Sequence, residues 1–158
     1  MSIKLICYGV RDVEIPFFKR LNKYSYELVL EEDFLNHDNV ELAKDAQAVM
    51  IRGNCNADSQ NIEKLNSYGV KYILTRTVGF NHIDLEAANK FGIKVARVPG
   101  YSPNAISELA VTLAMMLLRH TAYTVDRTKN KNFVVDENMF SKEIRKCTVG
   151  VLGTGKIG

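Results

Sequence analysis

The chain has 158 residues, 46% hydrophobic and 25% charged, which is typical of a globular protein with one core and room for a second small one. The formal net charge of +3 is too small and too evenly spread to favour nucleic acid or an anionic membrane as a partner. The most apolar run, residues 109–118, is too short to span a bilayer, and Cys7, Cys55 and Cys147 are too far apart for a metal site, so we expect reduced thiols in the cytoplasm.

Over the first hundred residues, short apolar runs alternate with helix-like stretches. The runs predict strands at residues 3–10, 26–30, 48–53, 71–77 and 94–98. Apolar residues three or four apart predict helices at residues 14–22, 39–46, 58–69 and 81–92, and Gly69 and Gly92 are placed as C-terminal caps of the last two. Repeated βα units of this kind indicate an α/β protein with a doubly wound parallel sheet and helices on both faces.

Pro99 and Gly100 interrupt this alternation, and we place a domain boundary there. After them, Ser102 is a candidate N-cap, and Pro103 suits the first turn of a helix predicted over residues 103–120. That helix is apolar on almost every face, so we expect it to be buried on all sides, between two domains or two subunits. A polar stretch follows, and then residues 147–153 predict a new buried strand.

The last predicted strand leads into a glycine-rich turn. Gly153, Gly155 and Gly158 fit the pattern G-x-G-x-x-G, in which glycines let the backbone approach a pyrophosphate at the start of a helix. The pattern alone leaves open a merely structural turn. A triphosphate-binding loop is rejected, because Ile157 stands where that motif needs a hydroxyl and Gly150 falls within the strand.

In open α/β sheets, ligands bind beyond the carboxyl ends of the strands. The residues that follow those ends here are Arg11, Arg52, Val78 with Gly79, and Tyr101. Amide groups of Val78 and Gly79 are suited to cradle a carboxylate, since they lead into a predicted helix. Arg52 is a candidate anion-binding residue in the same cleft.

Each of these candidates also has a purely structural interpretation. Gly79 can simply ease a turn before a helix capped by Asn81 or Asp84, Arg52 can face solvent, and Tyr101 can be a packing residue at the domain junction. Among the histidines, His82 reads as an exposed residue at a helix start, whereas His37 and His120 have no visible partner. We therefore expect no catalytic acid or base in this chain.

Two segments carry a resemblance to a known family. The stretch "TRTVGFNHIDLEAANKFGIKVARVPGYSPNAISELAV" (residues 75–111) and the stretch "TVGVLGTGKIG" (residues 148–158) resemble the NAD-dependent D-2-hydroxyacid dehydrogenases, nearest to the D-lactate and (R)-2-hydroxyglutarate branch. The resemblance implies a flavodoxin-like substrate domain at residues 1–99 with strand order 2-1-3-4-5. It also implies that residues 100–158 supply an interdomain helix, a homodimer contact and the truncated start of a Rossmann NAD-binding domain.

The resemblance further assigns roles to the candidate residues. It places Val78 and Gly79 as donors to the carboxylate of a 2-oxo or 2-hydroxy acid, Tyr101 in the pocket lining and Arg52 opposite the substrate side chain. Family members are roughly twice as long, with their catalytic residues beyond this segment, so we expect an N-terminal fragment that is inactive alone. A non-catalytic NAD-sensing or scaffold module is the alternative. The implied NAD-pyrophosphate residues are Gly153, Gly155, Lys156, Ile157 and Gly158.

Overall fold

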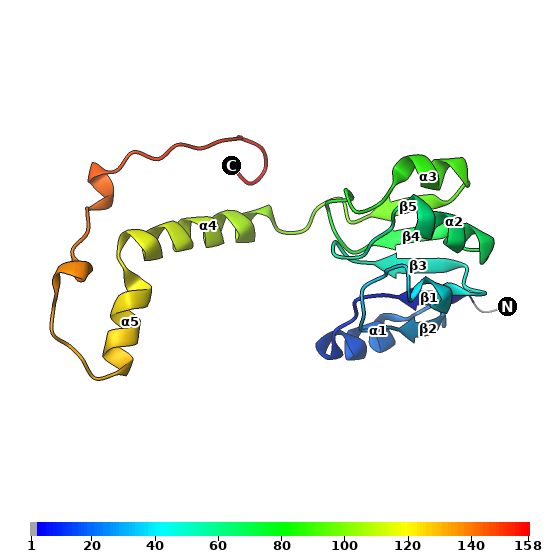
Figure 1. Ribbon diagram of the computed structural model, residues 1–158, viewed down its shortest axis with the longest axis horizontal. Helices are drawn as coiled ribbons and strands as arrows, with labels where there is room; N and C mark the ends of the chain where they lie inside the picture. The colour runs from blue at the N-terminus through cyan, green and yellow to red at the C-terminus, as the bar shows by residue number, and fades with distance from the viewer. Residues whose placement is uncertain (1–2) are drawn as a thin grey trace. The chain divides into compact units, whose positions relative to one another are not determined.

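The structure is a computed structural model that describes residues 3–158 and forms two compact units, the first ending at Pro99 and the second beginning at Gly100. The first unit is built on a five-stranded sheet (Figure 1), and every strand pairs in parallel with its neighbours in the order β2-β1-β3-β4-β5. Both the parallel sheet and the predicted strand order are confirmed. The strands are β1 (Lys4–Cys7), β2 (Glu27–Leu30), β3 (Ala48–Ile51), β4 (Tyr72–Thr75) and β5 (Lys94–Arg97).

The sheet is covered on both faces, as alternation along the strands requires. On one face the strand residues pack against α2 (Ser59–Ser67) and α3 (Leu85–Lys90), which insert Ile62, Leu65 and Ala88 into the main core. On the other face a smaller cluster packs against α1 (Ile15–Leu21). The buried strand residues of the main core are Ile6, Val49, Ile51 and Ile73, and those of the smaller cluster are Leu5, Cys7 and Ala48.

Local sequence explains where two of the helices begin and end. Asp58 and Asp84 act as N-caps, with side-chain oxygens that accept from the backbone N–H groups of Asn61 and Ala87 at 2.9 Å. Asp84, and not Asn81, is therefore the cap of α3. The helices are followed by Gly69 and Gly92, whose φ angles of +92° and +68° confirm them as terminating glycines.

Two predictions for the first unit need correction. The helix expected at residues 39–46 is only a 3₁₀ turn, η2 (Val40–Ala43). Its buried residues, Val40 and Ala43, are three apart, a spacing that one 3₁₀ turn satisfies as well as an α-helix. The strands are also shorter than the apolar runs, since the chain bends out of the sheet near its carboxyl edge; after β1, for example, Gly9 takes a φ of +67°.

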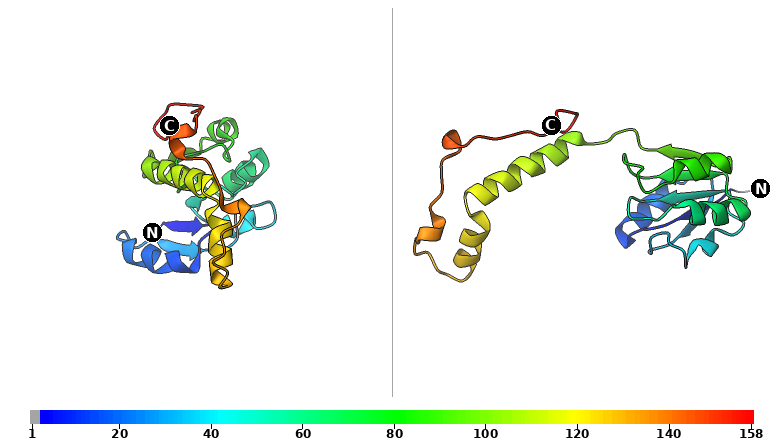
Figure 2. Two further views of the ribbon diagram at one scale, coloured as in Figure 1. Left: turned by 90° about the vertical axis from the view of Figure 1, so that its left-hand side faces the viewer. Right: turned by 45° about the horizontal axis from the view of Figure 1, so that its top comes forward.

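The second unit contains two α-helices, α4 (Pro103–Leu118) and α5 (Thr121–Lys129), followed by a largely irregular segment (Figure 2). Pro103 lies in the first turn of α4, as predicted, and Ser102 stands at the N-cap position, but its side chain makes no capping hydrogen bond. However, none of the described residues of α4 is buried, and Leu117 is 78% exposed. The described chain by itself therefore does not bury α4, and its burial between two domains or two subunits stays a prediction.

The strand expected at residues 147–153 is also wrong. The described residues there are extended but unpaired, and Val149 and Val151 are exposed. A strand exists only where a neighbour takes its backbone hydrogen bonds, and the described second unit contains no other strand. Two short 3₁₀ turns, η3 (Glu137–Met139) and η4 (Ile144–Lys146), precede this segment. Among residues 3–158, no helix combines the length and the apolar character needed to cross a membrane.

Candidate functional site

Three of the loops at the carboxyl edge of the sheet carry the candidate residues of the first unit or lie against them, and they follow β1, β3 and β4. Gly9 in the first loop has no room for a side chain: a Cβ there would lie 2.7 Å from Phe34 Cδ1 and 3.2 Å from Arg52 Cδ. Its positive φ also favours glycine. The tight turn at Gly9 thus lets Phe34 and Arg52 close against the end of β1.

Arg52 follows β3 and is held against this turn. Its Nη1 donates to the carbonyl of Gly9 at 3.3 Å, and its guanidinium carbon lies 5.9 Å from the centre of the Phe34 ring. The side chain is half-buried, and its other N–H groups have no acceptor within residues 3–158. Arg52 is therefore a positioned cation with donors to spare, as an anion-binding arginine requires.

Arg11 does not reinforce Arg52. Its Nε lies 3.2 Å from Glu14 Oε2 and its Nη2 lies 3.3 Å from Glu14 Oε1. Glu14 also accepts from Arg76 Nη1 at 3.0 Å. The hydrogen bonds from Arg11, together with the charge of Arg76, hold the pKa of Glu14 down to about 2. Both arginines are thus engaged with one carboxylate, which leaves Arg52 as the available cation.

The loop after β4 presents unpaired amides. The carbonyl of Val78 accepts from Arg97 Nη1 at 2.8 Å, and the carbonyl of Gly79 accepts from Thr77 Oγ1 at 2.7 Å. By contrast, the N–H groups of Val78 and Gly79 have no acceptor anywhere in the described chain. A Cβ on Gly79 would meet nothing within 4 Å, so the backbone is open to a ligand. Two successive free amides beside open space are therefore a candidate nest for an anion.

Three polar side chains lie behind this loop; Thr75 and Thr77 were not singled out from the sequence, and His82 was not assigned to the site. Thr75 Oγ1 lies 2.6 Å from Thr77 Oγ1 and 3.1 Å from Nε2 of His82. His82 is half-buried, so its assignment as an exposed helix-start residue is wrong, and burial lowers the pKa of its imidazole. In the sequence, Thr75 and Thr77 alternate within the strand predicted at residues 71–77, which indicates that their side chains lie on the same face. No spacing rule predicts that His82, seven residues after Thr75, bonds to it.

The expectation that His37 lacks a partner is also wrong, since its Nε2 lies 2.7 Å from Asp58 Oδ2. Asp58 is already the cap of α2 and accepts from Asn56 as well, so this pair secures two loops. His120, in turn, is the left-handed residue between α4 and α5. In the described part of the chain, no group of three or more His, Cys, Asp or Glu side chains is arranged to hold a metal ion.

The remaining candidates belong to the second unit. Tyr101 is 67% exposed. The glycine-rich turn closes on itself, because Gly153 has a φ of +91° and a Cβ on Gly158 would collide with the carbonyl of Gly153. Both positions thus require glycine, which fits a backbone that approaches a phosphate closely. Gly155, Lys156 and Ile157 lie within the same exposed turn.

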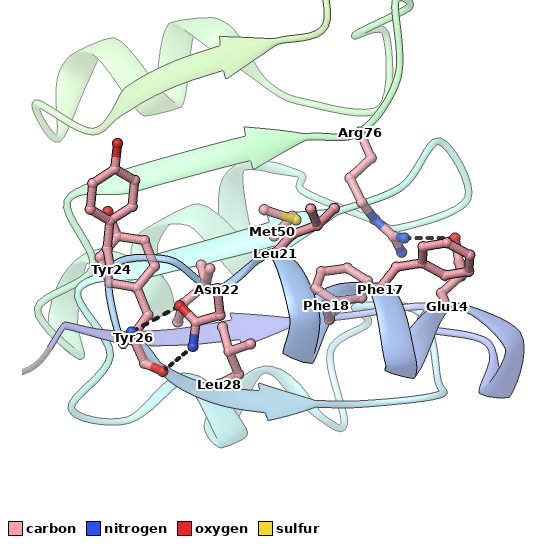
Figure 3. A pocket seen from close by; sticks show the side chains of 11 residues that line it. Glu14, Phe17, Phe18, Leu21, Asn22, Tyr24, Tyr26, Leu28, Met50 and Arg76 are labelled. Carbon is pink, nitrogen blue, oxygen red and sulfur yellow. Dashed lines mark hydrogen bonds and ion pairs between the residues drawn. The ribbon is translucent and has the colours of Figure 1, made fainter.

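A hollow of the first unit lies elsewhere, between α1 and the sheet (Figure 3). It measures about 520 Å³, and most of its lining is apolar. Its two charged residues, Glu14 and Arg76, are paired with each other, and Arg76 Nη2 also donates to the carbonyls of Tyr8 and Gly9 at 3.2 and 2.9 Å. A hollow whose charges are already satisfied offers an anionic substrate little, so the loops at the carboxyl edge remain the candidate site.

The chain was compared with protein families and with known proteins. The model of the family "D-isomer specific 2-hydroxyacid dehydrogenase, catalytic domain" matches residues 4–149. The chain is 40% identical over 157 residues to an aromatic 2-oxoacid reductase of Clostridium sporogenes, and 35% identical over 157 residues to a D-lactate dehydrogenase of Escherichia coli. Each match covers 99% of this chain and 47% of the relative, so the chain spans about half the length of these relatives.

Among solved structures, the chain matches D-lactate dehydrogenases. The apo-structure of D-lactate dehydrogenase from Escherichia coli matches with a TM-score of 0.82 and 35% identity, covering 98% of this chain and 49% of that one. A D-lactate dehydrogenase from Aquifex aeolicus, complexed with NAD and lactic acid, matches with a TM-score of 0.83 and 28% identity. That match covers 98% of this chain and 45% of the other.

Proposed function

Because the chain belongs to the D-isomer-specific 2-hydroxyacid dehydrogenase family, we propose that it supplies the substrate-binding part of an NAD-dependent enzyme that interconverts 2-oxo acids and D-2-hydroxy acids. The observation that carries this proposal is the pair of unpaired amides at Val78 and Gly79, in a loop whose carbonyls are both occupied. This arrangement suits the one group that all such substrates share, the carboxylate.

The chain's own contribution is to bind and orient the substrate. The N–H groups of Val78 and Gly79 donate to the carboxylate, and the guanidinium of Arg97, whose Nη1 bonds to Val78, adds positive charge beside it. Fixing the carboxylate in this way holds C2 of the substrate in one position, which lowers the entropic cost of the reaction. The acid–base residue is not among the side chains of this chain that we assign to the site.

Arg52 is proposed to face the side chain of the substrate, which is the carbon substituent on C2. It lies at the end of β3, and β3 and β4 are neighbours paired through Ile51 and Thr75, so Arg52 shares the sheet edge with Val78. Its free N–H groups favour a second carboxylate, as in 2-oxoglutarate, over a methyl group, as in pyruvate. Tyr101 is proposed to line the same pocket in the whole protein.

The glycine turn is proposed to bind the pyrophosphate of NAD through Gly153, Gly155, Lys156, Ile157 and Gly158. The closed turn between Gly153 and Gly158 supports this, since neither position tolerates a side chain. Bound NAD supplies the hydride acceptor, and its reduced form the donor. However, no strand or helix in the described second unit fixes this turn, so we propose that the 158-residue chain alone binds NAD weakly and is inactive.

We also propose that the whole protein is a homodimer. The exposed apolar side chains of α4 support an interface there, since surfaces of this kind mark association sites. The three free cysteines, Cys7, Cys55 and Cys147, agree with a reducing compartment such as the cytoplasm.

The proposed function is tested by assaying the whole protein with NADH and a series of 2-oxo acids, with chiral analysis of the product. We expect reduction to the D-hydroxy acid. Formation of the L-isomer, or no oxidation of NADH with pyruvate, phenylpyruvate or 2-oxoglutarate, would contradict the proposal. NAD binding without any turnover would instead support the alternative, a sensing module.

A further inference from the structure

Behind the carboxylate-binding loop runs a continuous chain of hydrogen bonds. It starts at Nε2 of His82, passes Thr75 Oγ1 at 3.1 Å and Thr77 Oγ1 at 2.6 Å, and ends at the carbonyl of Gly79 at 2.7 Å. Thr75 is only 3% exposed, so the middle of the chain is shielded from water. Hydrogen bonds in such surroundings are costly to break, because water does not replace them.

The hydrogen bonds of this series can run in only one direction, from His82 to Gly79. A carbonyl only accepts, so the single hydroxyl proton of Thr77 is used on Gly79. Thr77 must then accept from Thr75, which uses the proton of Thr75 in turn. Thr75 is left to accept from His82, and this requires the proton of the imidazole to be on Nε2.

This series of hydrogen bonds holds the last of three successive peptide groups in the loop after β4. A trans peptide is planar, so holding its carbonyl also fixes the N–H on its other side. The carbonyl of Thr77 accepts from the Val98 N–H at 3.2 Å, which fixes the N–H of Val78, and the bond from Arg97 to Val78 likewise fixes the N–H of Gly79. The next peptide follows Gly79, the residue with the greatest backbone freedom, and its carbonyl is held by Thr77 alone.

We propose that His82 is a positioning residue for substrate binding: through Thr75 and Thr77 it holds the peptide after Gly79, and so directs the N–H of Phe80 at the substrate carboxylate beside the amides of Val78 and Gly79. The held peptide also carries the N–H of Phe80, which has no acceptor within residues 3–158 and becomes a third donor of the nest. The inference rests on the proposed function for the identity of the anion, but the ordering of the loop does not depend on it.

The first test is made on the 158-residue chain by NMR. We expect the ring of His82 to carry its proton on Nε2 at neutral pH, as read from its ring-nitrogen couplings. We also expect a backbone order parameter near about 0.85 at Phe80, falling below about 0.6 in the Thr77→Val and His82→Leu variants, while Val78 and Gly79, held by Val98 and Arg97, keep their order. Ser67→Ala is the matched control, since it also removes a hydroxyl that donates to a backbone carbonyl, at 2.7 Å from Lys64, but far from the loop in sequence.

A conservative variant separates positioning from packing. Gln in place of His82 keeps an N–H donor at a similar distance from the backbone, so His82→Gln should retain the order of the loop that His82→Leu loses. A proton on Nδ1 of His82 instead of Nε2 would overturn the proposal, and this measurement is made on the wild-type chain. Unchanged order parameters in a folded Thr77→Val protein would overturn it as well.

In the whole protein, Thr77→Val and His82→Leu should raise the KM for the 2-oxo acid about tenfold, the loss expected for one positioning hydrogen bond. The KM for NADH should stay the same and kcat should change less than KM. Equal losses in both KM values would contradict a role confined to the substrate loop. A whole protein that reduces no 2-oxo acid would refute the proposed function, whereas the NMR results judge the positioning role by themselves.

Discussion

The Arg76 guanidinium lies 3.0 Å from the carboxylate of Glu14, a residue 62 positions earlier in the chain. The pair joins the end of β4 to the turn before α1, and only 20% of the Arg76 side chain and 23% of the Glu14 side chain are exposed. Both residues also contact the carboxyl edge, Arg76 through the carbonyl of Gly9 and Glu14 through Arg11. This ion pair therefore fixes the first loop of the candidate site.

Glu14→Gln should lower the free energy of unfolding at pH 7 by about 1–2 kcal/mol, because it leaves Arg76 largely buried without its counter-charge. The pKa of Glu14 is about 2 in the folded chain, against an ordinary 4.5, so the unfolded state binds more protons between these values. The stabilisation is thus complete above pH 4.5 and is lost as the pH falls towards 2.

Urea denaturation at pH 7 and pH 3 measures this effect. The difference between wild type and Glu14→Gln should shrink at the lower pH. Glu41→Gln is the matched control, since Glu41 pairs with Lys44 at 3.2 Å with 63% of its side chain exposed, and should change stability little. Equal effects of the two substitutions would refute the role given to Glu14.

Gly9→Ala should destabilise the first unit more than Gly69→Ala. Both glycines have positive φ, so each substitution carries a conformational cost of about 1 kcal/mol. At Gly9 the new methyl would also displace Phe34 and Arg52, whereas at Gly69 it meets nothing within 4 Å. Thermal unfolding of the two variants gives the comparison; a larger loss for Gly69→Ala would mean that the Gly9 turn is not tightly packed.

The three cysteines should differ in reactivity towards a thiol reagent. Cys7 and Cys55 are buried, and burial raises the pKa of the Cys7 thiol to about 12, so little thiolate forms. Cys147 is only partly covered and should be modified first. Mass spectrometry after brief labelling should find one adduct, at Cys147, in the native chain and three after denaturation. Early labelling of Cys7 would contradict the packing of the smaller core cluster.

Arg52→Ala in the whole protein should lower kcat/KM for 2-oxoglutarate ten- to a hundredfold relative to pyruvate, since a charge-assisted bond contributes about 1.5–3 kcal/mol. Arg20→Ala is the matched control: Arg20 also lies over a phenylalanine, 5.2 Å from the ring of Phe17, but on α1. If the ratio between the two substrates does not move, Arg52 does not select the substrate.

The sheet was predictable because its signals are local. An apolar run such as that around Ile73 predicts a strand of the sheet. Gly69 and Gly92 mark the ends of the helices that precede β4 and β5. Val149 and Val151 carry the same signal but remain exposed, since a strand also needs a neighbour that the described second unit does not provide. The exposure of α4 has the same cause. An apolar helix face predicts that another surface covers it, but it does not identify that surface.

The site was predictable in part. Val78, Gly79 and Arg52 follow from the rule that ligands gather at the carboxyl ends of strands. The pairing of Arg11 with Glu14 and the bond from His82 to Thr75 were not, because they depend on how loops fold over the sheet edge. Side-chain contacts of this kind have no periodicity to reveal them.

Binding of a substrate carboxylate by the amides of Val78 and Gly79 is measured by titrating the ¹⁵N-labelled 158-residue chain. Pyruvate should shift both amide resonances in a saturable way, while acetone, which lacks the carboxylate, should leave them in place. The amide of Gly69, already bonded to the carbonyl of Asn66 at 3.0 Å, should not respond to either compound. Shifts that are the same for acetone and pyruvate, or that leave Val78 and Gly79 untouched at saturating pyruvate, would contradict the account.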